Sequence, residues 1–221
     1  MIEINKSLVQ NFSLDTNYIT PPLDFLVNLK DEGMYIGEVF KDDRFYCKIQ
    51  ISCKKSAPDY QTDIELSELS SIKPNHFEVL PDGYAVFYLS EGEEKYNIQL
   101  EKNDDLIFDN QSILGNELVG ITLFTPGDYE CTNDSPVSSL SINVTEVSND
   151  QYNENEPIEV EIIESGFSKS DITIESGQAI LFKLAKDSRL RINPINNQEE
   201  KKMKASWSES VKSIKKQNTK S

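Results

Sequence analysis

The sequence predicts an all-β protein made of tandem Greek-key β-sandwich modules, with an N-terminal arm and a basic C-terminal tail. Short segments rich in Tyr, Phe, Ile and Val alternate with turn-like breaks along the body of the chain. The body shows no convincing helical periodicity. Many short strands joined by tight turns are typical of sandwiches and Greek-key barrels.

The first expected elements are an arm and a complete domain. Residues 1–22 have few periodic signals and end in Thr20-Pro21-Pro22, which favours an extended N-terminal arm. A β-sandwich domain is expected over residues 23–147, with turns at Lys41-Asp42-Asp43, Pro81-Asp82-Gly83 and Pro126-Gly127-Asp128. Its expected strands are residues 34–40, 45–53, 64–66, 77–80, 84–89, 96–100, 106–108, 118–124, 128–131 and 140–147.

A linker and a shorter module are expected next. The polar segment SNDQYNENEP, residues 148–157, predicts an acidic linker. A second, incomplete β module is expected over residues 158–198, with strands at residues 158–163, 172–174, 179–184 and 190–192. Residues 199–221 form the basic amphipathic tail.

An internal repeat favours a duplicated β unit. Residues 98–108, IQLEKNDDLIF, align without a gap to residues 172–182, ITIESGQAILF. Asn103 matches Gly177, and both residue types adopt the left-handed conformation of tight turns. The spacing between the copies is too long for a solenoid repeat.

Two segments resemble parts of a cupredoxin-type module. GFSKSDITIESGQAILFKL, residues 166–184, is similar to its opening strands, and LFTPGDYECTND, residues 123–134, is similar to its closing turn and Tyr-x-Cys strand. The resemblance, over residues 98–134 and 158–184, implies cupredoxin-like or Ig-like Greek-key modules that lack the copper ligands. A blue-copper site needs two His and a Cys, whereas His76 is the one His of the chain. Cys131 is therefore expected to be a core thiol.

The residues for catalysis are scarce, so we predict no enzyme activity and no catalytic or cofactor-binding residues. His76 would have to act alone as a base, and no Gly-x-Ser-x-Gly, HExxH, CxxC, Walker or dinucleotide motif occurs. Cys47 and Cys53 lie on the apolar face of one alternating strand, about 20 Å apart, which is too far for a disulfide. We interpret both as buried hydrophobic residues. Whether Cys131 pairs with one of them stays open.

Calcium is the one cofactor that the residue types leave open. Asp42-Asp43, Asp104-Asp105 and residues 149–156 offer the oxygen ligands that calcium prefers. None of these segments matches an EF-hand loop. They are interpreted either as calcium ligands or as solvated acidic loops, and no metal-binding residue is assigned.

Charge is divided unequally between the body and the tail. The formal charge of the chain is −16, yet residues 201–221 contain seven Lys and one Glu. The body therefore carries −22 and the tail +6. Opposite fields steer association between proteins. The acidic body argues against nucleic acid as its partner, whereas contact of the tail with a membrane or nucleic acid stays open.

The tail also has an apolar stripe. Met203, Trp207, Val211 and Ile214 are spaced four, four and three residues apart, as on one face of a helix. Basic amphipathic helices bind partner grooves or membrane surfaces. The predicted partner-binding residues are Lys201, Lys202, Met203, Lys204, Trp207, Val211, Lys212, Ile214, Lys215 and Lys216. The alternative is a solubilising C-terminus.

These observations predict a non-enzymatic structural or interaction protein. We expect a subunit of a homo- or hetero-oligomeric assembly, in a virion or a surface layer, held by β-edges and the basic C-terminal arm. The alternative is a ligand- or carbohydrate-binding β-sandwich module that depends on calcium. No stretch is long enough to span a membrane and no secretory signal is visible, so virion and cytoplasm stay open as locations.

Overall fold

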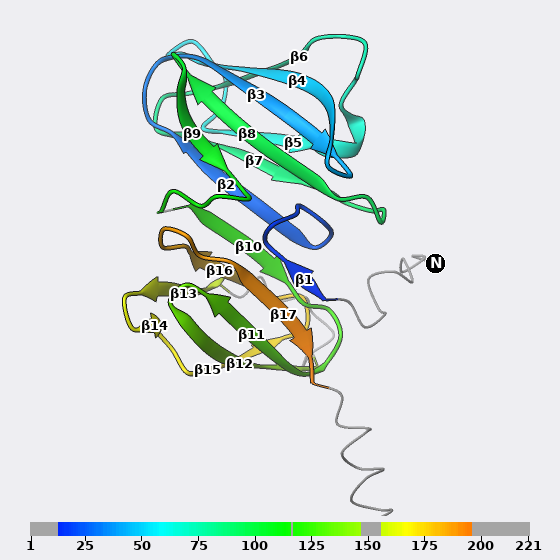
Figure 1. The fold of residues 1–221 in the computed structure, drawn as a ribbon, viewed down its shortest axis with the longest axis vertical. Helices are drawn as coiled ribbons and strands as arrows, with labels where there is room; N and C mark the ends of the chain where they lie inside the picture. The colour runs from blue at the N-terminus through cyan, green and yellow to red at the C-terminus, as the bar shows by residue number, and fades with distance from the viewer. Residues whose placement is uncertain (1–12, 116, 147–155, 196–221) are drawn as a thin grey trace, which may run out of the picture.

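The computed structural model describes residues 13–115, 117–146 and 156–195, and β-strands dominate them. One turn of 3-10 helix, Leu66–Glu68, is the only helical element in these ranges. The strands stack along the long axis of the molecule (Figure 1). The prediction of an all-β class is confirmed.

A seven-stranded sheet, which we call the long sheet, runs through the whole body in the order β14-β13-β16-β10-β2-β7-β5. In Figure 1, β2 and β10 lie side by side near its middle. The bounds of its strands are β2 (Leu23–Leu29), β5 (Gln61–Glu65), β7 (Gly83–Tyr88), β10 (Leu118–Thr122), β13 (Ile158–Ile163), β14 (Gly166–Phe167) and β16 (Ala179–Lys183).

Two five-stranded sheets cover one face of the long sheet, one over each half of the body. The first has the order β6-β4-β3-β8-β9, from β3 (Gly33–Lys41), β4 (Arg44–Cys53), β6 (Asn75–Val79), β8 (Tyr96–Lys102) and β9 (Asp105–Asp109). The second has the order β1-β17-β11-β12-β15, from β1 (Leu14–Asp15), β11 (Gly127–Asp134), β12 (Val137–Thr145), β15 (Asp171–Glu175) and β17 (Leu190–Pro194).

The chain passes from the long sheet to a covering sheet and back repeatedly, so that the body is a β-solenoid of about five turns. The winding is not that of a regular parallel β-helix, because most neighbouring strands are antiparallel. The parallel ladders are β4 with β6, β5 with β7, β12 with β15 and β13 with β16.

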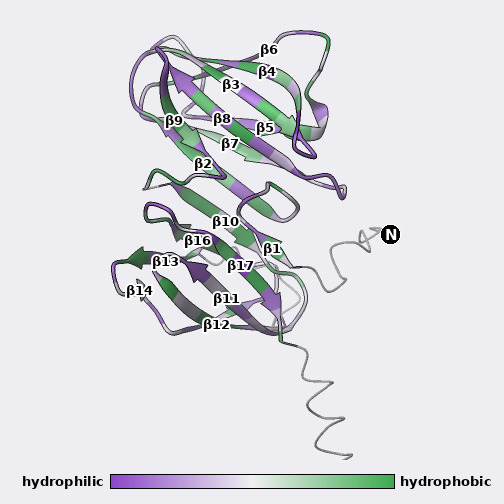
Figure 2. Ribbon diagram, in the orientation of Figure 1, coloured by the Kyte–Doolittle hydropathy of each residue, from purple (hydrophilic) through white to green (hydrophobic). Residues whose placement is uncertain are grey.

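One row of buried side chains crosses the long sheet and joins its two halves. Its members face one another in ladder order and have no exposed surface: Ile64, Phe87, Phe25, Val119, Phe182 and Val160. Full burial of each such side chain stabilises the fold by about 1.5–3 kcal/mol. Figure 2 shows the alternation of apolar and polar residues that places such a row on one face of a sheet.

The expectation of tandem β-sandwich modules, cupredoxin-like or Ig-like, is therefore wrong, and so is the cupredoxin resemblance. Separate modules would each close a core of their own, whereas here β2 and β10 pair directly and the buried row continues from one to the other. The segment 123–134 leads into β11, and the segment 166–184 contains β14 to β16. Both contribute to the same half of the body.

The two halves repeat one connectivity and are related by a pseudo-two-fold axis. The strands β2 to β8 match β10 to β17 in order, with β14 as an addition. The axis passes through the Phe25–Val119 pair, because Leu26 faces Leu118 on one side and Asp24 faces Gly120 on the other.

Matching tyrosines support this relation. The hydroxyl of Tyr35 donates to the carbonyl oxygen of Asp31 at 3.0 Å, and that of Tyr129 donates to the carbonyl oxygen of Thr125 at 2.8 Å. Each tyrosine follows a glycine by two positions, Gly33 with φ 141° and Gly127 with φ 152°. Side chains with a Cβ rarely adopt this conformation, which accounts for glycine at both turns.

The halves exchange their first strands. β1 precedes β2 in the chain but pairs with β17, and β9 precedes β10 but pairs with β8. Leu14 of β1 faces Ile192, and Phe108 of β9 faces Leu100. Each exchanged strand covers an edge that would otherwise present unpaired backbone groups. The exchange thus ties the start of the described chain to its end.

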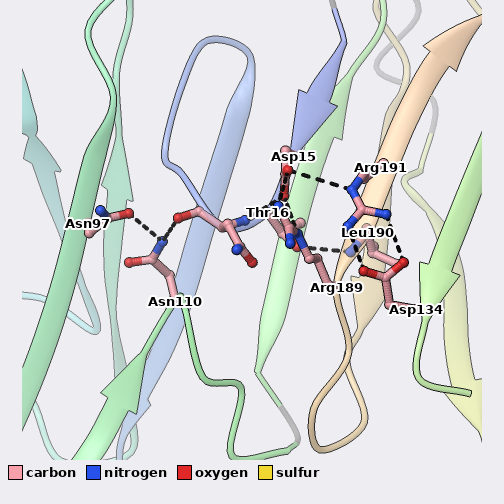
Figure 3. A network of polar contacts seen from close by, with 9 residues as sticks. Asp15, Thr16, Asn97, Asn110, Asp134, Arg189, Leu190 and Arg191 are labelled. Carbon is pink, nitrogen blue, oxygen red and sulfur yellow. Dashed lines mark hydrogen bonds and ion pairs between the residues drawn. The ribbon is translucent and has the colours of Figure 1, made fainter. Parts of the chain in front are cut away.

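Matching polar groups fix the two exchanged segments (Figure 3). The amide of Leu190 donates to Thr16 Oγ1 at 2.9 Å, and the amide of Ile98 donates to Asn110 Oδ1 at 2.7 Å. Asn110 Nδ2 also donates to the carbonyl oxygen of Asn17 at 2.9 Å. This last bond links the two exchange points directly.

An ion pair reinforces the exchange of β1. Arg189 donates to both carboxylate oxygens of Asp15, at 2.9 Å and 2.6 Å, while Arg191 binds Asp134 in the same bidentate way (Figure 3). Burial disfavours the charged form of Asp15. The hydrogen bonds from Arg189 and the Asn17 amide, with the charges of Arg189 and Arg191, outweigh burial and lower the pKa of Asp15.

The repeat between residues 98–108 and 172–182 is not the duplication that the structure contains. The first copy spans the paired strands β8 and β9, whereas the second spans β15 and β16, which belong to different sheets. The counterpart of residues 172–182 is residues 77–87, FEVLPDGYAVF, which span β6, a turn and β7.

The expected strands from residue 34 onward coincide with observed strands to within a few residues. The strands β1, β2 and β14 were not predicted from the sequence. Residues 1–12 lie outside the described residues, and the rest of the expected arm contains β1. Residues 147–155, most of the expected linker, also lie outside them, and strands from both sides of that segment share the same sheets.

We predict that Asp15→Ala lowers the free energy of unfolding at pH 7 by about 1–2 kcal/mol, because it frees β1 and leaves Arg189 without its partner. Urea denaturation measures the change. Asp134→Ala is the matched control, since it removes a similar ion pair that holds no exchanged strand, and its cost should stay below about 1 kcal/mol. Equal losses for the two variants would contradict this role of Asp15. The loss should shrink as the pH falls through the lowered pKa of Asp15 and this carboxyl is protonated.

Candidate functional site

The face of the long sheet opposite the buried row is the strongest candidate for an interaction site. We call it the open face, because none of the other described strands packs on it. Residues that alternate with the buried ones point to this side, such as Leu26 between Phe25 and Val27 in β2. These residues are partly exposed, and their neighbours in sequence are buried.

Two rows of side chains make up the open face. The first row follows the ladders through Asp63, Val86, Leu26, Leu118, Lys183 and Glu161. The second contains Glu65, Tyr88, Asp24, Gly120, Leu181 and Glu159. The rows hold five carboxylates and one lysine.

The charges lie mostly at the two ends of the open face. Asp63 and Glu65 stand on β5, and Glu159 and Glu161 stand on β13. Between these strands lie Leu26, Val86, Leu118 and Leu181, all partly exposed. The open face therefore has a largely apolar centre, which also holds Asp24 on β2 and Lys183 on β16, and an acidic group at each end.

The acidic group on β5 is held by the backbone. Glu65 accepts hydrogen bonds from the amides of Ser67, at 3.3 Å, and Ser90, at 2.9 Å, so its position is fixed. In the described part of the chain, no lysine or arginine forms an ion pair with Asp24, Asp63 or Glu65.

The environment of Asp24 follows from this arrangement. Burial and, after it, the negative charges of Asp63 and Glu65 raise the pKa of Asp24 to about 6. A positive group that approached these carboxylates would relieve the repulsion and favour the ionised form of Asp24. The other end of the face already has a positive group, because Lys183 Nζ lies 3.2 Å from Glu161 Oε1.

A cavity of about 250 Å³ lies beside the open face, where β2 runs past the start of β10. Leu26, Asn28, Lys30 and Ile107 contribute to its wall. Glu117 also lines it, and its carboxylate accepts hydrogen bonds from the amides of Leu114 and Gly115, at 3.1 Å and 2.7 Å. The Glu117 carboxylate therefore stabilises its own loop.

The predicted partner-binding residues of the tail, Lys201 to Lys216, lie outside the described residues.

His76 is exposed on β6, at an edge of the first covering sheet. Cys47, Cys53 and Cys131 are free thiols in the core, and burial raises the pKa of each. The interpretation of Cys47 and Cys53 as buried hydrophobic residues is confirmed.

The acidic loops considered for calcium form hydrogen bonds and turns of the fold, as far as they lie within the described residues. Asp42 accepts from the amide of Lys95 at 3.2 Å, and Asp43 accepts from Asn97 Nδ2 at 3.2 Å. Asp104 has a positive φ of 68°, in the turn between β8 and β9. Over the described ranges, no group of three or more His, Cys, Asp or Glu is arranged to hold a metal ion. Residues 149–155 lie outside them.

The open face was not predicted from the sequence, because no strand was expected over the residues of β2. The segment LDFLVNL has apolar residues at every second position from Leu23 to Leu29, which places Asp24, Leu26 and Asn28 on the other side of a strand. That alternation is the signal that would have found the centre of the face. The pairing of β2 with β10 has no comparable signal in the sequence.

None of the described helical segments is long and apolar enough to cross a membrane. Comparisons with protein-family models, with curated proteins and with solved structures found no match. Neither the fold nor these comparisons support the expected cupredoxin-like or virion assignment, which is therefore withdrawn.

We predict that Asp24→Asn raises the free energy of unfolding by about 1–2 kcal/mol at pH 7.5 in dilute protein. The raised pKa means that protonation of Asp24 stabilises the folded state below about pH 4, and this contribution is lost as the pH rises through about 6. The substitution keeps the group neutral at every pH. Urea denaturation at several pH values checks this.

The gain should therefore shrink steadily as the pH falls from 7.5 toward 4. A gain of equal size at both ends of this range, or a loss at pH 7.5, would show that Asp24 is not held in an unfavourable charged state.

Proposed function

We propose that the protein is a non-enzymatic structural or interaction protein, a subunit that assembles with other protein chains. It does so through the open face, through the free β-edges of its sheets and through its basic C-terminal tail. The observation that carries this proposal is the open face itself, with a largely apolar centre and, at one end, carboxylates that form no ion pair with a described lysine or arginine.

The composition of the open face favours a protein partner. Contiguous apolar side chains on a polar surface are typical of interaction sites. The carboxylates at both ends repel phosphate groups, which disfavours nucleic acid or an anionic membrane as the partner of this face. They favour a basic partner, and the chain carries a basic segment in residues 201–221.

The chemistry of the described residues supports a role without catalysis. The single His stands exposed on an edge strand, and the three thiols are buried in the core. A nucleophile is activated by an adjacent base, a lowered pKa or a metal, whereas burial raises the pKa of all three thiols. Glu117, the buried carboxylate beside the cavity, binds backbone amides.

We predict that the full-length protein associates at low salt and dissociates at high salt, because contacts between exposed opposite charges weaken as the Debye length falls to about 3 Å at 1 M. Light scattering coupled to size-exclusion chromatography measures the mass. Replacing Lys201, Lys202, Lys204, Lys212, Lys215 and Lys216 by Gln should abolish the association.

The same six positions replaced by Arg form the matched control, because this variant keeps the charge and should associate as the wild type does. A wild-type mass that is monomeric at every salt and protein concentration would contradict the proposed function. So would a Gln variant with an unchanged mass and salt dependence.

A further inference from the structure

The open face has a size that can be estimated from its strands. Its apolar centre spans β7, β2, β10 and β16, four neighbouring strands. Three inter-strand spacings cover about 14 Å. One acidic group lies beyond β7, on β5, and the other lies beyond β16, on β13. A ligand laid across the strands along the first row therefore meets in turn a carboxylate, three apolar side chains and an ion pair: Asp63, then Val86, Leu26 and Leu118, then Lys183–Glu161.

The C-terminal tail has the complementary order along its length. Lys201 and Lys202 come first, the apolar stripe of Met203, Trp207, Val211 and Ile214 follows, and Lys215 and Lys216 come last. The spacing of the stripe predicts a helix, in which the eleven steps from Met203 to Ile214 give a rise of about 16 Å. This length matches the apolar centre, and it places basic residues over both acidic ends.

We propose that the open face binds the C-terminal tail, residues 201–216, of a second copy of this chain. The proposal rests on the function proposed above and names the surface and the segment that carry it. Apolar contact between the stripe and Leu26, Val86, Leu118 and Leu181 provides the affinity. The lysines at each end fix the direction and position of the tail by pairing with the carboxylates.

The place where the tail begins favours a neighbour's tail over the chain's own. Ile195, the last described residue, follows β17, which belongs to a covering sheet. The tail thus begins on the layer of the body opposite the open face. When two copies exchange tails, each open face is occupied by the tail of the other copy, and the result is a closed two-fold dimer. Direct contact between two open faces is disfavoured, because their acidic ends would meet each other.

Trp207 provides the test, because it is the one Trp of the chain. In the full-length wild type, its fluorescence should move to shorter wavelength as protein concentration rises at low salt, and return as salt is added. The variant Asp63→Lys/Glu159→Lys reverses the charge at both ends of the open face. It should raise the concentration at the midpoint of the shift by at least about tenfold.

The matched control is Glu101→Lys/Glu130→Lys. It makes the same change in net charge at two exposed carboxylates of the covering sheets. It should leave the midpoint near that of the wild type. Circular dichroism establishes that each variant keeps its strand content. A second variant, Val86→Ser, removes apolar surface without changing the charge and should also weaken binding.

Mixing two full-length variants identifies the source of the tail. The donor carries Asp63→Lys/Glu159→Lys and keeps Trp207. The acceptor keeps the open face, carries Trp207→Phe, and has the six tail lysines replaced by Gln. Addition of the acceptor should move the donor's emission to shorter wavelength in a saturable way, and Val86→Ser in the acceptor should weaken this effect.

The remaining outcomes separate the two proposals. Association by light scattering with the same midpoint for Asp63→Lys/Glu159→Lys and its control overturns the binding of the tail to this face, while the proposed function stands. A wild-type emission at short wavelength that does not change on dilution shows that the chain's own tail binds, and it overturns the role of a second copy. Failure to associate under any condition overturns both.

Discussion

The pairing of β2 with β10 is the interaction on which the rest of the body depends. It makes a single sheet of strands that come from both halves of the chain, and its central pair, Phe25 and Val119, is completely buried. Residues of the row on either side of this pair belong to the same hydrophobic core. Because a register slip of one residue would turn Phe25 to the solvent, the buried row also fixes the register of the join.

The exchange of first strands adds a second constraint of the same kind. Each half lacks one edge strand of its own and receives it from the other half, at Leu14–Ile192 and at Phe108–Leu100. Thr16 and Asn110 repeat one hydrogen-bond pattern at the two exchange points. The β-solenoid of about five turns is thus closed by its own chain. The opposite face of the long sheet is not covered by any other strand of the described ranges.

The sequence predicted most strands, because apolar residues at every second position determine which side of a strand is buried. It did not predict how the strands are joined. Pro21-Pro22 ended the predicted arm, and no strand was predicted over residues 23–29, although Leu23, Phe25 and Val27 stand at every second position. The repeat was read from the similarity of two strand–turn–strand segments, whereas ladder positions show that residues 77–87 are the true counterpart of residues 172–182.

The candidate site was predictable only in part. The basic tail and its apolar stripe are visible in the sequence, because charge and helical spacing are local properties. The surface proposed to bind it combines Asp24 and Leu26 with Asp63 and Val86, which become neighbours only through the pairing of β2 with β7 and of β7 with β5. Such neighbours depend on strand order, and strand order is set by the competition among all possible pairings of the chain.

The claim that the two halves form one body can be tested directly by differential scanning calorimetry of the full-length chain in high salt, where association is suppressed. The continuous sheet and the exchanged strands predict a single transition in which the calorimetric and van't Hoff enthalpies of unfolding agree. Two separable transitions, or a calorimetric enthalpy about twice the van't Hoff value, would show that the halves unfold independently and would contradict this account.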